Sequence, residues 1–112
     1  MSIVLSEIRP DGSESPDQTY DKSVLRIGRD PFECEIAFSR ELYPMVSRTH
    51  AELRSDGGKW FIVDLNASYG TYLDGRRVAG SQQVASGQTI QFGNSFFSDK
   101  IGDSKLKCIT QY

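Results

Sequence analysis

The stretch HAELRSDGGKWFIVD, residues 50–64, decides the fold class of this chain. Two β-rich runs, 50–54 and 60–64, lie on either side of the turn Ser55-Asp56-Gly57-Gly58. An aspartate-glycine turn between two such runs is typical of a β-hairpin, because these residues accept the positive φ that tight hairpin turns require. The stretch therefore predicts two antiparallel strands. Its apolar residues at 60–63 are interpreted as core and sheet surface rather than as a cofactor site.

Short runs with apolar residues at every second position continue on both sides of this hairpin. They lie at 2–9, 19–20, 24–28, 36–38, 71–73, 76–78, 83–84, 89–92 and 105–110, separated by clusters of Gly, Asp, Ser and Pro such as 10–16. Period two is the pattern of half-buried strands, and no helical period is present. The sequence therefore predicts an all-β sandwich of two antiparallel sheets with about ten or eleven short strands. Loops at one end of such a sandwich are the natural binding surface.

Length and charge limit the functions that the chain can have. With 112 residues, 38% of them hydrophobic, we expect one domain over residues 1–112 that folds alone. The net charge is −2, whereas nucleic-acid binders carry a basic excess that displaces phosphate counterions. Nucleic acid is therefore not expected as a partner, and any phosphate must be recognised by a local pocket.

The cysteines and the first residues point to no metal, membrane or secretion. Cys34 and Cys108 are too few for a disulfide scaffold and stand in no metal-binding spacing, so we expect structural thiols, no metal and no cofactor. Residues 1–7 lack a basic region before a continuous apolar run, so no signal peptide or membrane span is readable. These features favour an intracellular, cytoplasmic setting. The oligomeric state stays open.

Three polar islands lie at the ends of predicted strands. They are Ile27-Gly28-Arg29, then residues 46–50 (VSRTH), then residues 64–71 (DLNASYGT). Arginines offer charge-assisted and bidentate hydrogen bonds to a phosphate, and serine hydroxyls with loop backbone N–H groups can complete the shell around its oxygens. Together the islands predict a phosphate-binding site.

In this order and spacing the islands resemble the forkhead-associated (FHA) family, whose signature is Gly-Arg, then Ser-Arg-x-His, then Gly-Thr after a polar loop. The resemblance covers about residues 24–93, and Asp74-Gly75 and residues 86–93 (SGQTIQFG) add to it. It implies a β-sandwich that binds phosphothreonine-containing segments of other proteins. The chain would then be a signalling adaptor that a kinase switches on by modifying its partner.

The resemblance also implies roles for single residues. The residues it assigns to the phosphopeptide are Arg29 and Ser47 at the phosphate, Arg48 beside it, Ser68 with a further hydroxyl, and Tyr69 on the peptide. The residues it assigns to structural support of the site are Gly28, His50, Gly70 and Thr71. The glycines would allow close backbone approach or positive φ, and a histidine between loops can both donate and accept hydrogen bonds.

Two positions depart from the family pattern, and one loop is longer than the pattern needs. Tyr69 stands where many members have an Asn, so a hydroxyl replaces an amide. Asp74 replaces another frequent Asn, and a carboxylate near the ligand would repel phosphate or favour basic residues in the peptide. The apolar loop 41–45 either packs over the edge of the sandwich or contacts a partner.

Two other functions compete with the phosphothreonine adaptor. One is an FHA-like module that binds its partner independently of phosphate. The other is a small hydrolase built on Ser47 and His50, which is disfavoured because no acid is spaced to orient the histidine. We therefore expect no enzyme activity. We also expect the domain to work within a longer polypeptide or an assembly, since recognition of a phosphosite has no output of its own.

Overall fold

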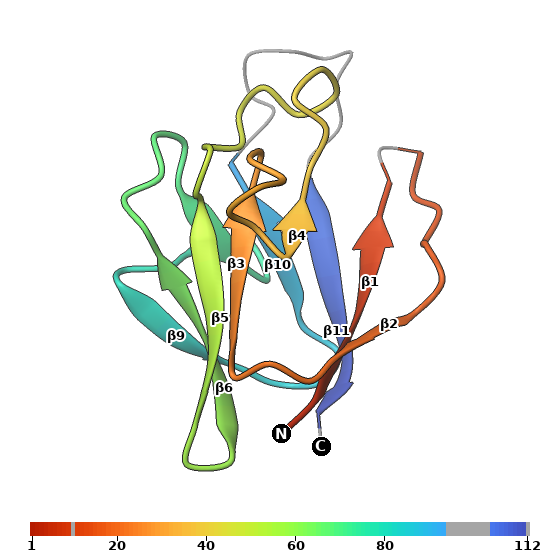
Figure 1. Cartoon of the computed structure of the whole chain (residues 1–112), viewed down its shortest axis with the longest axis vertical. Helices are drawn as coiled ribbons and strands as arrows, with labels where there is room; N and C mark the ends of the chain where they lie inside the picture. Colours follow the sequence, from red (N-terminus) through yellow and green to blue (C-terminus); the bar gives the residue numbers. More distant parts are fainter. Residues whose placement is uncertain (10, 94–103, 112) are drawn as a thin grey trace.

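The computed structural model describes residues 1–9, 11–93 and 104–111, and its described part forms eleven β-strands in two packed sheets (Figure 1). The predicted all-β sandwich is confirmed. Pro10, expected in a loop, lies outside the described residues. The strands are β1 (Ile3–Ile8), β2 (Gln18–Tyr20), β3 (Val24–Gly28), β4 (Ile36–Ala37), β5 (Ala51–Asp56), β6 (Lys59–Asp64), β7 (Thr71–Leu73), β8 (Arg76–Arg77), β9 (Ser81–Val84), β10 (Thr89–Phe92) and β11 (Lys105–Gln111).

The two sheets have different strand orders. One sheet has the order β2-β1-β11-β10-β7-β8 and the other β4-β3-β5-β6-β9. The expectation of purely antiparallel sheets is wrong at one place, because β3 and β4 pair in parallel. The loop 29–35 folds back so that Ile36 lies level with Ile27, and β4 then runs in the same direction as β3. This fold-back places the loop after Gly28 over the end of the sheet.

The hairpin of β5 and β6 lies in the middle of the five-stranded sheet. Its register runs from Ala51 opposite Asp64 to Asp56 opposite Lys59. The two-residue turn is Gly57-Gly58, with φ of 58° and 81°, so the strand extends through Asp56. Two successive positive φ values define the hairpin turn that matches the twist of the strands, and glycine adopts both without strain.

The core lies between the sheets and draws on both. Its largest fully buried side chains include Leu25, Ile27, Leu53, Trp60 and Ile62 from the five-stranded sheet and Ile3, Leu5, Ile90 and Phe92 from the six-stranded sheet. Removing such side chains from water is the main favourable term in folding. The core therefore joins the first strands of the chain to the last.

The loop 41–45 packs over the edge of the sandwich, as one of the two interpretations predicted. Tyr43 and Met45 are buried members of the core, whereas Glu41, Leu42 and Pro44 are exposed, Leu42 at 58%. The Phe38 ring contacts Tyr43 edge to face at a centroid distance of 5.3 Å and Phe92 at 5.5 Å. These contacts fix the segment between β4 and β5 against the core.

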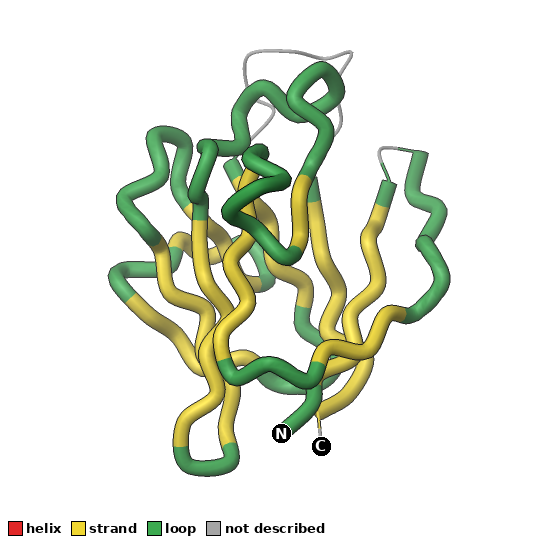
Figure 2. The backbone as a smooth tube through the Cα atoms, in the orientation of Figure 1, coloured by secondary structure: helices red, strands yellow, loops and turns green. Residues whose placement is uncertain are grey.

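Loops 29–35, 38–50 and 65–70 lie together at the end of the sandwich opposite the two termini (Figure 2). They join β3 to β4, β4 to β5 and β6 to β7, and they carry the three polar islands. In the part of the chain that the structure describes, no helix is long and apolar enough to cross a membrane.

Candidate functional site

Backbone hydrogen bonds align the end of β3 with residues 47–50. The Arg29 N–H donates to the Ser47 carbonyl at 3.0 Å, and the Asp30 N–H donates to the Arg48 carbonyl at 3.2 Å. On the other side of Gly28, the His50 N–H donates to the Ile27 carbonyl at 2.8 Å. Two islands that are far apart in sequence thus run side by side.

Gly28 is required by the closeness of these two segments. A Cβ atom at this position would lie 2.1 Å from the Arg48 carbonyl oxygen and 2.9 Å from that of Ser47. Backbone atoms cannot move aside as the end of a flexible side chain can. Any larger residue would therefore push residues 47–48 away from Arg29.

His50 is fully buried and ties two loops together. Its Nδ1 accepts the backbone N–H of Ser47 at 3.0 Å, and its Nε2 lies 2.7 Å from the Gly70 carbonyl, to which it donates. One accepting and one donating nitrogen define the neutral imidazole. Burial lowers the pKa of His50, although the bond to Gly70 and the nearby Asp64 charge oppose the shift. The ring therefore stays uncharged and links residues 47–50 to loop 65–70.

Gly70 and Thr71 close loop 65–70. Gly70 has a φ of 79°, its N–H donates to the Ala67 carbonyl at 3.2 Å, and its carbonyl also accepts the Gly93 N–H at 2.8 Å. Thr71 is fully buried, and its hydroxyl donates to Asp64 Oδ1 at 2.7 Å. The positive φ favours glycine, and the buried hydroxyl is satisfied by the residue that precedes the loop.

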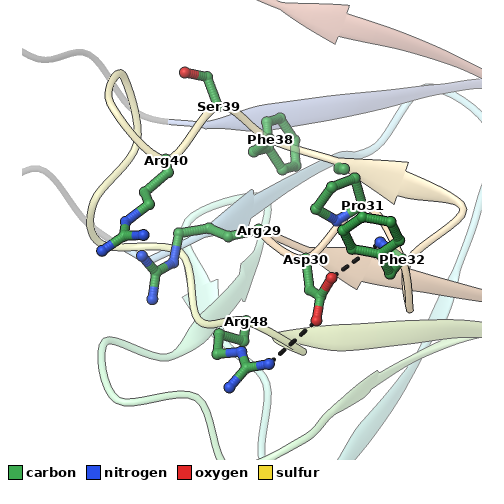
Figure 3. Close-up of a pocket in the computed structure, with 9 residues that line it drawn as sticks. Arg29, Asp30, Pro31, Phe32, Phe38, Ser39, Arg40 and Arg48 are labelled. Atoms are coloured by element: carbon green, nitrogen blue, oxygen red, sulfur yellow. Dashed lines mark hydrogen bonds and ion pairs between the residues drawn. The ribbon is translucent and has the colours of Figure 1, made fainter.

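A pocket of about 960 Å³ opens where loop 29–35 meets residues 37–40 and 48 (Figure 3). Its lining residues are Arg29, Asp30, Pro31, Phe32, Ala37, Phe38, Ser39, Arg40 and Arg48. The pocket has a cationic part formed by arginines and an apolar part that includes Pro31 and Phe32, and Phe32 is 96% exposed.

The structure brings some of the predicted ligand residues together and leaves others on a neighbouring loop. Arg29 and Arg48 line the pocket, and Ser47 adjoins them through its bond to the Arg29 N–H. Ser68 and Tyr69 are exposed on loop 65–70 and do not line this pocket. The His50 bond to Gly70 sets the position of their loop relative to Ser47.

The pocket arginines differ in their ion pairing. Arg48 is exposed and forms an ion pair with Asp30, with 3.3 Å between Nη2 and Oδ2. The pKa of the Asp30 carboxyl is lowered, mainly by the Phe32 N–H that it accepts and further by Arg48, although burial opposes the shift. Arg29 has a buried Nε with no hydrogen-bond partner, and among the described ion pairs none involves it.

Arg40 is a pocket residue that sequence reasoning missed. It follows β4 in the loop that leads to Tyr43, and it lines the same pocket as Arg29 (Figure 3). No motif contains it, and an isolated arginine in an irregular loop carries no signal in the sequence. Its position depends on how the loop 38–46 packs against the core.

The Asp74 carboxylate lies outside the lining of the arginine pocket. Asp74 occupies the hairpin turn after β7 with a φ of 48°. Its Oδ1 accepts the Thr89 N–H at 2.9 Å and its Oδ2 accepts the Gln88 side-chain amide at 3.1 Å. The carboxylate therefore holds a turn against β10 instead of facing that pocket.

Both cysteines are free and buried, and burial raises the pKa of each thiol. The Cys34 thiol donates to the Arg48 carbonyl at 3.4 Å, which helps to hold residue 48 beside the end of β3. Within residues 1–9, 11–93 and 104–111, no group of His, Cys, Asp and Glu side chains could hold a metal ion.

The sequence model of the FHA domain matches residues 25–93. The chain belongs to the FHA family. Its sequence is 42% identical to the glycogen accumulation regulator GarA of Mycolicibacterium smegmatis over 48 residues, which are 43% of this chain and 30% of GarA. It is 36% identical to the ABC transporter ATP-binding/permease protein Rv1747 of Mycobacterium tuberculosis over 55 residues, which are 49% of this chain and 6% of the transporter. The matched part of the chain thus covers less than a third of the length of these relatives.

Solved FHA domains share the fold along nearly the whole chain. The FHA domain of CT664 from Chlamydia trachomatis has a TM-score of 0.77 at 17% identity, covering 100% of both chains. FHA-1 of Mycobacterium tuberculosis Rv1747 has a TM-score of 0.65 at 26% identity, covering 97% of this chain and 99% of the other. A third similar structure, with a TM-score of 0.74 at 23% identity and covering 100% of this chain and 99% of the other, comes from work on phosphothreonine-dependent FHA domain interactions.

Proposed function

We propose that this FHA domain binds a phosphothreonine-containing segment of a partner protein and thereby acts as a phosphorylation-dependent interaction module in signalling. Arg29 carries the proposal. It lines the pocket, its buried Nε lacks a partner, and none of the described ion pairs neutralises it. An arginine that lines a pocket and has no anionic partner favours an anionic ligand, because its guanidinium can form charge-assisted hydrogen bonds with it.

A phosphate suits this arrangement better than a single carboxylate. It carries about −1.5 to −2 charges at neutral pH and three acceptor oxygens. The Arg29 guanidinium can bond two of these oxygens with its planar set of donors. We assign the phosphate contacts to Arg29 and Ser47, a supporting contact to Arg48, and the outer contacts to Ser68 and Tyr69 on loop 65–70.

The choice of threonine follows from family membership. An FHA structure with the same fold comes from work on phosphothreonine-dependent interactions, which supports threonine as the phosphorylated residue. We also propose that residues 1–112 form one interaction domain, because β1 pairs with β11 and the core joins both sheets.

The proposal describes a binding module and not an enzyme. Both ring nitrogens of His50 are bonded to backbone groups, Nδ1 to the Ser47 N–H and Nε2 to the Gly70 carbonyl. Neither nitrogen is left to take a proton from the Ser47 hydroxyl, which argues against the hydrolase alternative. Because protein kinases supply the ligand, we propose an intracellular, cytoplasmic site of action.

Calorimetric titration tests the proposal. The ligand is a degenerate phosphothreonine peptide library, and the comparison is the same library without phosphate. We expect phosphate-dependent binding, and we expect Arg29→Ala to weaken it roughly 10- to 100-fold because charge-assisted bonds contribute about 1.5–3 kcal/mol. Arg29→Lys should also weaken it, since one ammonium cannot reproduce a planar fork.

Arg76→Ala is the matched control, because Arg76 is an exposed arginine on β8 outside the arginine pocket. It removes the same charge and should leave the affinity within about twofold. Thermal melts of all variants check that the fold is intact. Equal binding of the phosphorylated and unphosphorylated libraries would disprove the proposed function and favour a partner recognised without phosphate.

A further inference from the structure

We infer that Arg40 is a direct phosphate-binding residue of this domain, and that Arg29 and Arg40, instead of Arg29 and Arg48, form the main clamp on the ligand. The inference rests on the proposed function. It assigns a contact to a residue outside the FHA sequence signature. Three features of the pocket support it: where Arg40 is held, how the pocket charges are paired, and how much positive charge is left over.

The backbone that carries Arg40 is anchored on both sides. On one side the Phe38 N–H donates to the Gly28 carbonyl at 2.8 Å, and the Phe38 ring is buried. On the other side the Tyr43 N–H donates to the Ser39 carbonyl at 2.9 Å, and Tyr43 is 3% exposed. A turn fixed at both ends limits the backbone entropy that the loop must lose on binding. Arg40 is therefore presented to the pocket by a held turn.

The direction of the side chains agrees with this position. Figure 3 shows the guanidinium groups of Arg29 and Arg40 extending to the same side of the pocket, while Arg48 reaches back to Asp30. Both Arg29 and Arg40 line the one pocket of about 960 Å³. A group bound at Arg29 would thus lie within the same opening as the Arg40 guanidinium.

Ion pairing separates Arg40 from Arg48. The Asp30 carboxylate lies 3.3 Å from Arg48 and offsets part of its charge, so a phosphate would have to compete with that carboxylate and be repelled by it. None of the ion pairs among the described residues involves Arg40. Arg40 can therefore bond an incoming anion without breaking an ion pair in the described part of the chain.

The charge of the pocket fits one phosphate. Its lining holds the guanidinium groups of Arg29, Arg40 and Arg48 and a single carboxylate, Asp30. The excess is about two positive charges, which matches the −1.5 to −2 charges of a phosphothreonine at neutral pH. If Arg40 were excluded from the contact, the remaining groups would leave the phosphate only about half neutralised.

The experiment compares single alanine variants of the whole chain with a phosphothreonine peptide chosen from the library. We expect Arg40→Ala to weaken binding about 10-fold or more, Arg48→Ala about threefold, and the Arg76→Ala control less than twofold. Arg40→Lys should recover part of the loss because it restores the charge without the fork. The melting temperatures should be unchanged, since all three arginines are exposed.

Measuring the effect of Arg40→Ala at high salt distinguishes a direct contact with the phosphate from long-range electrostatic attraction. Near 1 M salt the screening length is about 3 Å, so an effect of Arg40 that acts only through the field of the pocket should disappear there, whereas the loss from a broken contact should persist. A shift of the Arg40 Nε–H signal in the NMR spectrum on addition of the peptide should accompany the contact.

Three outcomes would overturn the inference about Arg40 but not the proposed function. In each of them, binding would still depend on the phosphate and on Arg29. Arg40→Ala could behave like Arg76→Ala, its effect could vanish near 1 M salt, or Arg48→Ala could be the more damaging of the two. A wild-type domain that does not distinguish phosphorylated from unphosphorylated peptide would instead disprove the proposed function, and the role of Arg40 with it.

Discussion

The loops at the binding end contain two groups of residues that differ in how their polar atoms are satisfied. The loop knot, which we define as Gly28, His50, Gly70 and Thr71, is closed by short bonds within the chain, one of them from the backbone N–H of Ser47. The arginine pocket, defined as Arg29, Arg40 and Arg48, has only the Arg48–Asp30 pair among the ion pairs of the described residues. One group holds the loops in place, and the other keeps its bonding capacity for a ligand.

This difference predicts that stability and binding can be changed separately. Removing a satisfied buried group leaves its partners unpaired and opens a cavity, so the folded state loses free energy. Removing a pocket arginine breaks at most the Arg48–Asp30 ion pair within the described part of the chain, so the main loss is a contact with the ligand. Substitutions in the loop knot should therefore lower stability first, and those in the arginine pocket should lower affinity first.

The largest effect is expected for His50→Ala. The change leaves the Ser47 N–H without its acceptor, removes a donor from the Gly70 carbonyl, and empties the space beside the Phe92 ring, now 5.6 Å from the imidazole centroid. We expect the free energy of unfolding to fall by roughly 3 kcal/mol. Urea titration followed by circular dichroism measures it.

Ser47→Ala is the comparison for His50→Ala, because it keeps the Ser47 backbone N–H that His50 accepts. It should cost about 0.5–1 kcal/mol of stability at most and weaken phosphopeptide binding. If His50→Ala kept full stability and lost all binding, His50 would belong to the ligand contacts and the separation of the two groups would fail.

Gly28→Ala is expected to have the next largest effect. The new Cβ would lie 2.1 Å from the Arg48 carbonyl oxygen, so residues 47–48 must move away from β3. Strain of this kind typically costs about 1–3 kcal/mol, and we expect about 2 kcal/mol together with a loss of phosphopeptide affinity. The measurements are urea unfolding and calorimetry.

Gly80→Ala is the matched control for Gly28→Ala. A Cβ at Gly80 would have no atom within 4 Å, but its φ is 78°. It should therefore cost only the roughly 1–2 kcal/mol of an alanine held at positive φ and leave affinity unchanged. Equal losses of affinity in both variants would show that the approach of residues 47–48 to Gly28 does not shape the site.

The sequence predicted the parts of this molecule that depend on local pattern. Alternation and turn residues located the β5–β6 hairpin and the other strands, because burial on one face of a strand imposes period two. The alternation was less clear for the short strands at 19–20 and 36–38, because each has only two or three residues. The parallel pairing of β4 with β3 was missed because loop 29–35 carries no pattern that shows which way the chain returns.

The site was predictable only where the signature names a residue. Residues 28–29, 47–50 and 68–71 stand in motifs, so the family resemblance could assign them roles. Arg40 stands in none, and it reaches the pocket because Phe38 and Tyr43 are buried on either side of it. The Asp30 carboxylate, which engages Arg48, was likewise not expected. The positions of both residues depend on contacts between loops. Such contacts leave no repeating pattern of apolar and polar residues from which they could be predicted.

The smallest expected effect is a dependence of the free energy of unfolding on pH. It should come from His50 in the loop knot and not from the arginine pocket. His50 is the single histidine, and burial lowers its pKa in the folded state below the ordinary value of 6.5. Between those two pKa values the unfolded chain binds a proton that the folded chain does not, so stability is full above about pH 6.5 and falls as the pH decreases. The slope is at most about 1.4 kcal/mol per pH unit. Asp11, Asp30, Glu35 and Glu52 have lowered pKa values and titrate below this window.

Urea unfolding at pH 7.5 and 5.5 should therefore show a loss of about 1 kcal/mol in the wild-type domain. His50→Gln supplies the comparison, because an amide can donate and accept but cannot take up a proton in this range. That variant should be less stable at pH 7.5 and change little between the two pH values. Arg40→Ala should keep the wild-type dependence, since Arg40 lies in the arginine pocket and does not bond to His50. The same loss in His50→Gln as in the wild type would mean that another group carries the effect, and His50 would no longer be the neutral link between the two loops.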